Sequence, residues 1–154
     1  PSVVGAKIGR QDVPVVGFSG DGAFGIAVNE LTAIGREEWP AVTQIVFRNY
    51  QWGAEKRNST LWYDDNFVGT ELDTQVSYAG IAKACGLQGV VAKTMDELTE
   101  ALHTAIKDQM ENGKTTLIEA MINQELGEPF RRDAMKKPVA VAGVSASDMC
   151  EQVV

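Results

Sequence analysis

The chain has 154 residues, of which 44% are hydrophobic and 23% charged, and its formal net charge is −7. This size and composition suit one domain with a buried core. The acidic excess argues against a protein that binds nucleic acid or a membrane surface. No apolar run reaches the roughly 18 residues that a membrane-spanning helix needs.

Cys85 and Cys150 lie far apart, and neither belongs to a CxxC or Cys/His pattern. We therefore expect reduced thiols in a cytoplasmic protein, in preference to a disulfide. The first ten residues read as the body of a helix and lack an initiator methionine. We interpret the chain as a fragment of a longer protein, with one domain over residues 1–125 and its C-terminal tail over 126–154.

Apolar runs alternate with helical patterns along the chain. In chain order, we expect a strand at 14–18, a helix at 24–37, a strand at 42–47, a helix at 77–85, a strand at 89–92, a helix at 95–110 and a strand at 115–122. Short strand–helix–strand connections make the strands parallel. The predicted fold class is therefore α/β, a three-layer sandwich with helices on both faces of a parallel sheet.

Local signals mark the ends of one helix and one irregular segment. Thr94 and Glu97 match a capping box, in which the Glu97 side chain reaches back to the Thr94 backbone N–H. Asn112-Gly113 supplies a left-handed stop for the same helix. Residues 48–72 read as irregular and rich in aromatic side chains, so we expect a lid or a segment that faces a partner.

The first strand ends in Gly20-Asp21-Gly22, and the next strand is followed by Asn49. Ends of neighbouring parallel strands meet at one edge of the sheet, where open α/β sheets bind ligands. Glycines let backbone N–H groups approach a phosphate, and the carboxylate and amide oxygens suit Mg²⁺. The pattern predicts a site for Mg²⁺ and a phosphorylated ligand, against the alternative of a tight turn and an unrelated asparagine.

Gly20-Asp21-Gly22, followed by 25 residues and then Arg48-Asn49, resembles the signature of the thiamine-diphosphate-dependent enzymes. The resemblance implies that Asp21, Asn49 and the backbone carbonyl of Gln51 bind Mg²⁺. Arg48 departs from the pattern because it replaces the first of two asparagines. That asparagine is not a metal ligand, so the departure affects only a supporting hydrogen bond.

The resemblance also implies the residues that contact thiamine diphosphate, namely Gly20, Asp21, Gly22, Ala23, Phe24, Asn49, Gln51, Trp52 and Gly53. Ala23 and Phe24 would offer backbone N–H groups to the diphosphate, and the Phe24 ring would be free to pack in the core. The glutamate that activates the cofactor lies in a separate N-terminal domain in this family. We therefore expect no catalytic residue in this chain, and no turnover by the chain alone.

Three further runs resemble one branch of the family, the sulfoacetaldehyde acetyltransferases: residues 49–57, 67–72 and 125–134. That branch converts sulfoacetaldehyde and phosphate into acetyl phosphate and sulfite, and the resemblance implies a homodimer or homotetramer. Two anionic substrates call for cations. The candidates are Lys56, Arg57, Arg131 and Arg132. Each could instead be a solvated charge or part of a subunit ion pair, and we favour that interpretation for Arg131 and Arg132.

Two alternatives stay open. The first is another thiamine-diphosphate enzyme, such as an acetolactate synthase-like carboligase or a 2-oxo acid decarboxylase. The second is a non-catalytic phosphate-binding module with a flavodoxin-like sheet. Sulfite release, carbon dioxide release and Mg²⁺-dependent cofactor binding separate these alternatives.

Overall fold

The computed structural model describes residues 1–36 and 38–126. Nearly all of the predicted tail lies outside the described residues, together with Arg131, Arg132 and Cys150. Cys85 is a free cysteine. Among the described residues, no helix is both long enough and apolar enough to cross a membrane.

Four strands form one sheet in the order β1-β2-β4-β3. They are β1 (Val16–Gly20), β2 (Thr43–Arg48), β3 (Gln88–Ala92) and β4 (Thr116–Met121). Every neighbouring pair is parallel. The predicted fold class is therefore confirmed. The two central strands are rich in buried side chains, as expected of strands covered on both faces.

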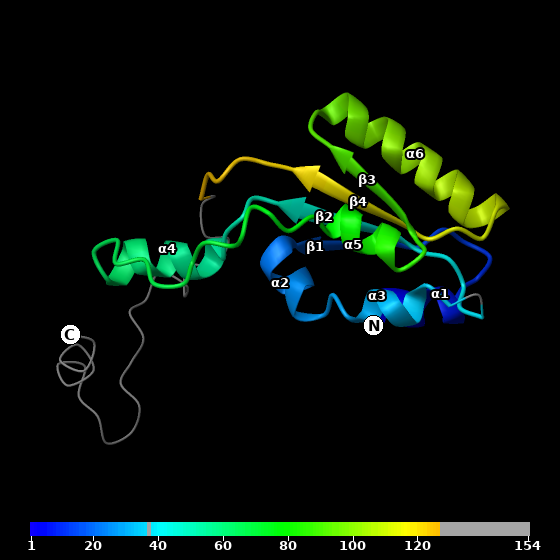
Figure 1. The fold of residues 1–154 in the computed structure, drawn as a ribbon, viewed down its shortest axis with the longest axis horizontal. Helices are drawn as coiled ribbons and strands as arrows, with labels where there is room; N and C mark the ends of the chain where they lie inside the picture. Colours follow the sequence, from blue (N-terminus) through cyan, green and yellow to red (C-terminus); the bar gives the residue numbers. More distant parts are fainter. Residues whose placement is uncertain (37, 127–154) are drawn as a thin grey trace, which may run out of the picture.

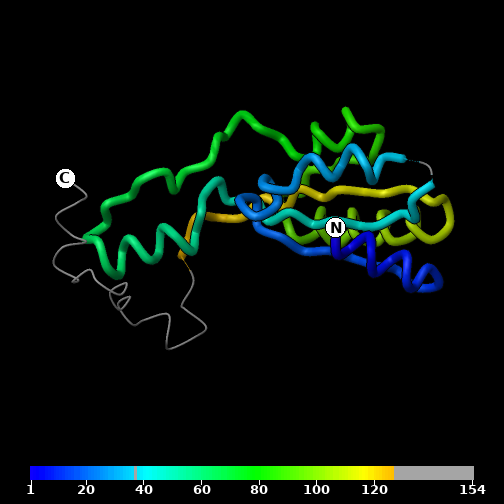
Figure 2. Tube along the Cα trace, turned by 90° about the horizontal axis from the view of Figure 1, so that it is seen from below, coloured from blue at the N-terminus to red at the C-terminus, as the bar shows by residue number. Residues whose placement is uncertain are grey.

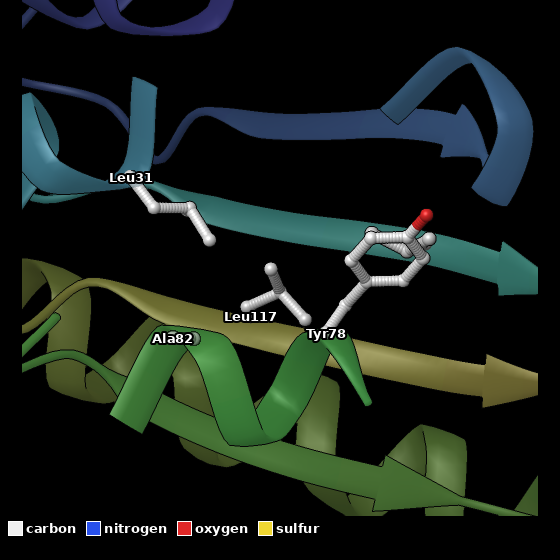
Figure 3. Close-up of a cluster of buried hydrophobic side chains, with 5 residues drawn as sticks. Leu31, Tyr78, Ala82 and Leu117 are labelled. Carbon is white, nitrogen blue, oxygen red and sulfur yellow. The ribbon is translucent and has the colours of Figure 1, made fainter. Parts of the chain in front are cut away.

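Helices cover both faces of this sheet (Figures 1 and 2). On one face, α6 (Met95–Glu111) closes a core formed by Ile45, Ala92, Ala105, Ile118 and Ala120. On the other face lie α2 (Asp21–Ile26), α3 (Glu30–Ile34) and α5 (Tyr78–Ala84). Figure 3 shows the second core, formed by Leu31, Val46, Tyr78, Ala82 and Leu117. α1 (Ser2–Gly9) lies beside α3.

The single helix predicted at 24–37 is wrong, because the structure has two short helices there, α2 and α3. Glycines at 22 and 25 each weaken a helix by about 1 kcal/mol relative to alanine. Gly25 instead makes room for a neighbour, since a Cβ there would lie 2.7 Å from the Tyr78 hydroxyl oxygen. Both glycines lie within α2, and the break itself falls at residues 27–29, between the two helices.

The first strand begins later than predicted, at Val16, and runs through Gly20. Pro14 has no N–H to donate to a strand ladder. The N–H of Val15 donates to the Gln109 side-chain oxygen, and its carbonyl accepts from the Gln109 Nε2. Because β1 extends to Gly20, the helix that follows starts at Asp21 itself.

Residues 48–72 are not wholly irregular, because they contain α4 (Gly53–Trp62). The run Ala54-Glu55-Lys56-Arg57 is made of good helix formers and was the signal for this helix. None of its residues is buried. α4 lies beyond the carboxyl ends of the strands, away from the sheet (Figures 1 and 2).

The ends of α6 follow the predicted chemistry with one change. The Thr94 hydroxyl accepts from the Glu97 N–H at 3.2 Å. The Glu97 carboxylate accepts from the N–H of Lys93 at 2.6 Å, one residue before the predicted Thr94. Gly113 has a φ of 61°, which confirms the left-handed stop after Asn112.

Candidate functional site

A cavity of about 360 Å³ lies at the edge where β1 and β2 end. Its lining includes eight of the nine residues predicted to contact a cofactor: Gly20, Asp21, Gly22, Ala23, Asn49, Gln51, Trp52 and Gly53. Phe47, Ala54, Glu55 and Ile122 complete the lining. The topology explains this gathering, because β1 and β2 are parallel neighbours whose following turns project from the same edge.

Asp21 is a buried carboxylate at this edge of the sheet, with an exposed fraction of 1%. Its Oδ2 accepts from Arg48 at 3.1 Å and from the backbone N–H groups of Asn49 at 3.1 Å and Tyr50 at 2.7 Å. Its Oδ1 accepts from the Gly22 N–H at 2.9 Å. A carboxylate oxygen accepts about two hydrogen bonds, so Oδ1 keeps capacity for a further ligand.

The Asn49 side-chain amide lies beside that carboxylate. One of its two terminal positions is 3.3 Å from Asp21 Oδ1 and 3.3 Å from the backbone oxygen of Gln51. The amide nitrogen at this position donates to both oxygens, whereas the amide oxygen there would bring three oxygen atoms together. Oxygens this close repel one another unless a proton or a cation lies between them. In octahedral Mg²⁺ coordination, with ligands at about 2.1 Å, neighbouring oxygens are about 3 Å apart. The donor set fits a hard divalent cation.

With its nitrogen at this position, the Asn49 amide donates to Asp21 Oδ1 and to the Gln51 carbonyl, and accepts from Gln51 Nε2, each at 3.3 Å. Among the described residues, no three His, Cys, Asp or Glu side chains gather into a metal-binding group. A cation here would therefore rely on one carboxylate and two neutral oxygens.

The turn after β2 fixes the direction of the Gln51 carbonyl. Tyr50 adopts a left-handed backbone with φ of 60°. Its carbonyl accepts from the Leu72 N–H at 2.8 Å, and the Trp52 N–H donates to the Thr70 carbonyl at 2.7 Å. The returning segment thus holds the turn on both sides of Gln51.

Ala23 lies in the first turn of α2, where backbone N–H groups have no acceptor within the helix, whereas the N–H of Phe24 has the carbonyl of the N-cap Gly20 four residues back. The Phe24 ring packs edge-on against Tyr78, with ring centres 5.2 Å apart. The ring of Phe24 therefore belongs to the core, and Phe24 does not line the cavity, so its predicted backbone contact with a cofactor stays a prediction.

Of the predicted anion-binding cations, Lys56 and Arg57 lie within the described residues, and neither lines the cavity. Lys56 pairs with Glu71 and lies 5.3 Å from the centre of the Phe67 ring. Arg57 donates to the Leu126 carbonyl at 3.3 Å. Both residues lie on α4, beyond the carboxyl ends of the strands, and these contacts are with residues outside the cavity.

The sequence reasoning missed a buried network behind the cavity. Arg48 lies between Asp21 and Glu119, with its Nε 3.4 Å from the Glu119 Oε1. The Tyr78 hydroxyl donates to the Asp21 backbone oxygen at 3.0 Å. Burial raises the pKa of Tyr78 above its ordinary value, although the nearby Arg48 acts in the opposite direction. Glu119 is the one charged residue in β4, and this isolated charge in a buried strand could have indicated a buried ion pair.

Residues 1–120 match the family described as thiamine pyrophosphate enzyme, C-terminal TPP binding domain. The chain belongs to this family. It is 84% identical over 154 residues to the sulfoacetaldehyde acetyltransferase of Roseovarius nubinhibens, covering all of this chain and 25% of that protein. It is 76% identical over 152 residues to the enzyme of the same name from Rhodobacter capsulatus, covering 99% of this chain and 26% of that protein.

A solved structure with a similar fold is the benzoylformate decarboxylase of Polynucleobacter necessarius, with a TM-score of 0.67 and 26% identity. The match covers 81% of this chain and 22% of that one. The chain thus spans about a quarter of the length of the curated relatives it matches. The resemblance inferred from the sequence is confirmed at the level of the family and of these relatives.

Proposed function

We propose that this chain is the cofactor-binding domain of a sulfoacetaldehyde acetyltransferase. The complete protein would convert sulfoacetaldehyde and phosphate into acetyl phosphate and sulfite. The observation that carries the proposal is the 84% identity, along the whole chain, to a relative that bears this name. The cavity at the carboxyl edge of the sheet supplies a fitting location for the cofactor.

The cation would be Mg²⁺, held by Asp21 Oδ1, the Asn49 amide oxygen and the Gln51 carbonyl oxygen. The backbone N–H groups of Ala23 and Phe24 would face the diphosphate of the cofactor. Gly20, Gly22, Trp52 and Gly53 would line the same end of it. When bound, thiamine diphosphate supplies the carbanion chemistry, and this chain's residues anchor and orient its diphosphate end.

The anionic substrates would be bound by cations near α4, for which Lys56 and Arg57 are the candidates within the described residues. Lys56 would have to exchange its Glu71 partner for a substrate anion. Arg131 and Arg132 stay candidates from the sequence alone. No catalytic residue is proposed within this chain, and we expect the activating glutamate in an N-terminal domain of the complete protein.

The complete protein would work in the cytoplasm as a homodimer or homotetramer. The exposed helix α4 supports a subunit contact, because none of its residues is buried in this chain. Tyr63, Phe67 and Val68, which follow α4, are also exposed. Covering such apolar side chains is the usual function of an interface.

The test is an assay of the complete protein with thiamine diphosphate, Mg²⁺ and phosphate. We expect equal amounts of sulfite and acetyl phosphate from sulfoacetaldehyde, and no comparable carbon dioxide release from pyruvate. Carbon dioxide release from pyruvate without sulfite release from sulfoacetaldehyde would contradict the proposal and favour a carboligase or a decarboxylase.

A further inference from the structure

Arg48 is buried at the end of β2, with an exposed fraction of 1%. Its guanidinium donates to Asp21 Oδ2 at 3.1 Å and to the carbonyls of Asp73 at 2.7 Å and Val76 at 2.9 Å. Its central carbon lies 4.1 Å from the centre of the Tyr50 ring. Burying a cation this completely is costly unless it is paired and hydrogen-bonded. Here both terminal nitrogens are hydrogen-bonded, whereas the buried Nε has no hydrogen-bond partner among the described residues and only faces Glu119 Oε1 at 3.4 Å.

These contacts divide the two oxygens of the Asp21 carboxylate between separate tasks. Oδ2 is committed to Arg48 and to two backbone N–H groups. Oδ1 accepts from the Gly22 N–H and faces the Asn49 amide, which in turn lies beside the Gln51 carbonyl. The guanidinium and the two N–H groups together set the rotation of the carboxylate, so that only one oxygen faces the Asn49 amide.

Arg48 also joins segments that are distant in the sequence. Its carbonyl partners, Asp73 and Val76, belong to the connection that leads into α5. Glu119 of β4 lies on its other side, and accepts from Ser77 Oγ at 2.9 Å and from the Ala79 N–H at 3.1 Å. The start of α5 and the carboxylate of the cation site are therefore braced by the same guanidinium.

We propose that Arg48 is a positioning residue for the cation site, which holds Asp21 as a ligand through a single oxygen. The proposal rests on the proposed function, because it concerns the same Mg²⁺ site. It assigns a specific task to the position at which the sequence departs from the family signature. Groups that orient metal ligands in this way typically affect metal affinity by roughly 10- to 100-fold.

A simple charge argument predicts the opposite sign. Arg48 is a cation beside a site for a second cation, so removal of its charge alone would strengthen Mg²⁺ binding. Positioning predicts that removal weakens binding, because the Asp21 carboxylate loses its fixed rotation. The sign of the change in affinity therefore separates the two explanations.

The experiment measures Mg²⁺ affinity in the complete protein by calorimetry at a fixed, saturating concentration of thiamine diphosphate. We expect Arg48→Gln to weaken Mg²⁺ binding by roughly 10- to 100-fold. Arg48→Lys should recover part of this loss, because lysine can reach Asp21 but lacks the fork that also serves the two carbonyls. Arg36→Gln is the matched control, since Arg36 is an exposed arginine paired only with Glu38 among the described residues.

The double variant Arg48→Gln/Glu119→Gln keeps the net charge of the network and leaves no unpaired buried Glu119. It carries the test if Arg48→Gln does not fold, and it should also bind Mg²⁺ more weakly than the unmodified protein. Mg²⁺ affinity equal to or tighter than that of the unmodified protein, in the folded variant, would overturn the proposal. Absence of Mg²⁺-dependent cofactor binding in the unmodified protein would instead overturn the proposed function.

Discussion

Among single residues, Gly22 has the tightest requirement within the cavity. A Cβ at this position would lie 2.9 Å from atoms of the Trp52 ring, closer than side-chain packing allows. We expect Gly22→Ala to displace the indole and to lower the free energy of unfolding by about 1–3 kcal/mol, as overpacking usually does. Denaturant unfolding followed by tryptophan fluorescence measures this change.

Gly20→Ala is the matched control from the same loop. A Cβ at Gly20 meets no atom within 4 Å, and the backbone there is extended, with φ of −72° and ψ of 159°. Alanine should therefore be accommodated without strain. Equal losses in the two variants would contradict the role assigned to the contact between Gly22 and Trp52.

The Tyr78 hydroxyl provides a prediction that depends on pH. Its hydrogen bond to the Asp21 carbonyl should make Tyr78→Phe less stable by about 0.5–1.5 kcal/mol at pH 8. Because burial raises the pKa of Tyr78 in the folded state, its contribution is complete below the ordinary tyrosine pKa of about 10. The contribution is lost as pH rises through the higher folded value.

The measurement is denaturant unfolding of both proteins at a series of pH values from 8 to 11. The stability advantage of the unmodified protein over Tyr78→Phe should shrink above about pH 10. Other ionisable groups are common to the two proteins, so they cancel in the difference. An advantage that grows with pH would contradict the stated direction.

Asp21 and Asn49 lie together, as predicted from the ends of two neighbouring parallel strands. Their role as metal ligands stays a prediction. Arg48 was treated as a minor departure, since a sequence does not show that its guanidinium would be enclosed by Asp21 and Glu119. Partners contributed by a distant strand become visible only in the folded chain.

At the scale of elements, α6 is tied to the start of β1 by the buried Gln109. Its amide accepts from the Val15 N–H and donates to the Val15 carbonyl and the Thr43 hydroxyl. We expect Gln109→Ala to leave these polar groups unsatisfied and to cost about 1–3 kcal/mol. Amide hydrogen exchange should quicken at Val15 and along β1.

His103→Ala is the control on the same helix, because His103 is exposed. Its exchange pattern along β1 should match that of the unmodified protein. Unchanged exchange in Gln109→Ala would show that the strand does not depend on this side chain.

The predicted elements were mostly of the right type, helix or strand, but their first and last residues were predicted less accurately. The sheet strands and α6 followed from apolar periodicity, which reflects their burial. The division into α2 and α3 at residues 27–29 was not predicted, because apolar residues continue at helical spacing through the break. α4 was not predicted, because none of its residues is buried and its sequence therefore has no apolar periodicity.

At the scale of the whole molecule, the described part of the chain leaves two features incomplete. The cavity is lined by residues at the carboxyl ends of β1 and β2, and α4 has no buried residue. α4 extends beyond the same ends of the strands (Figure 1). We therefore expect the rest of the complete protein, or a second subunit, to close the site from the side of α4.

The central claim is that Asp21 and Asn49 anchor thiamine diphosphate through Mg²⁺. Its most direct test is calorimetric titration of the complete protein with thiamine diphosphate, with Mg²⁺ and with a chelator, in the unmodified protein, Asp21→Asn and the control Asp12→Asn. We expect Mg²⁺-dependent binding in the unmodified protein and in Asp12→Asn, and at least a roughly tenfold loss in Asp21→Asn. Cofactor binding that is equally tight with the chelator, or unaffected by Asp21→Asn, would contradict the claim.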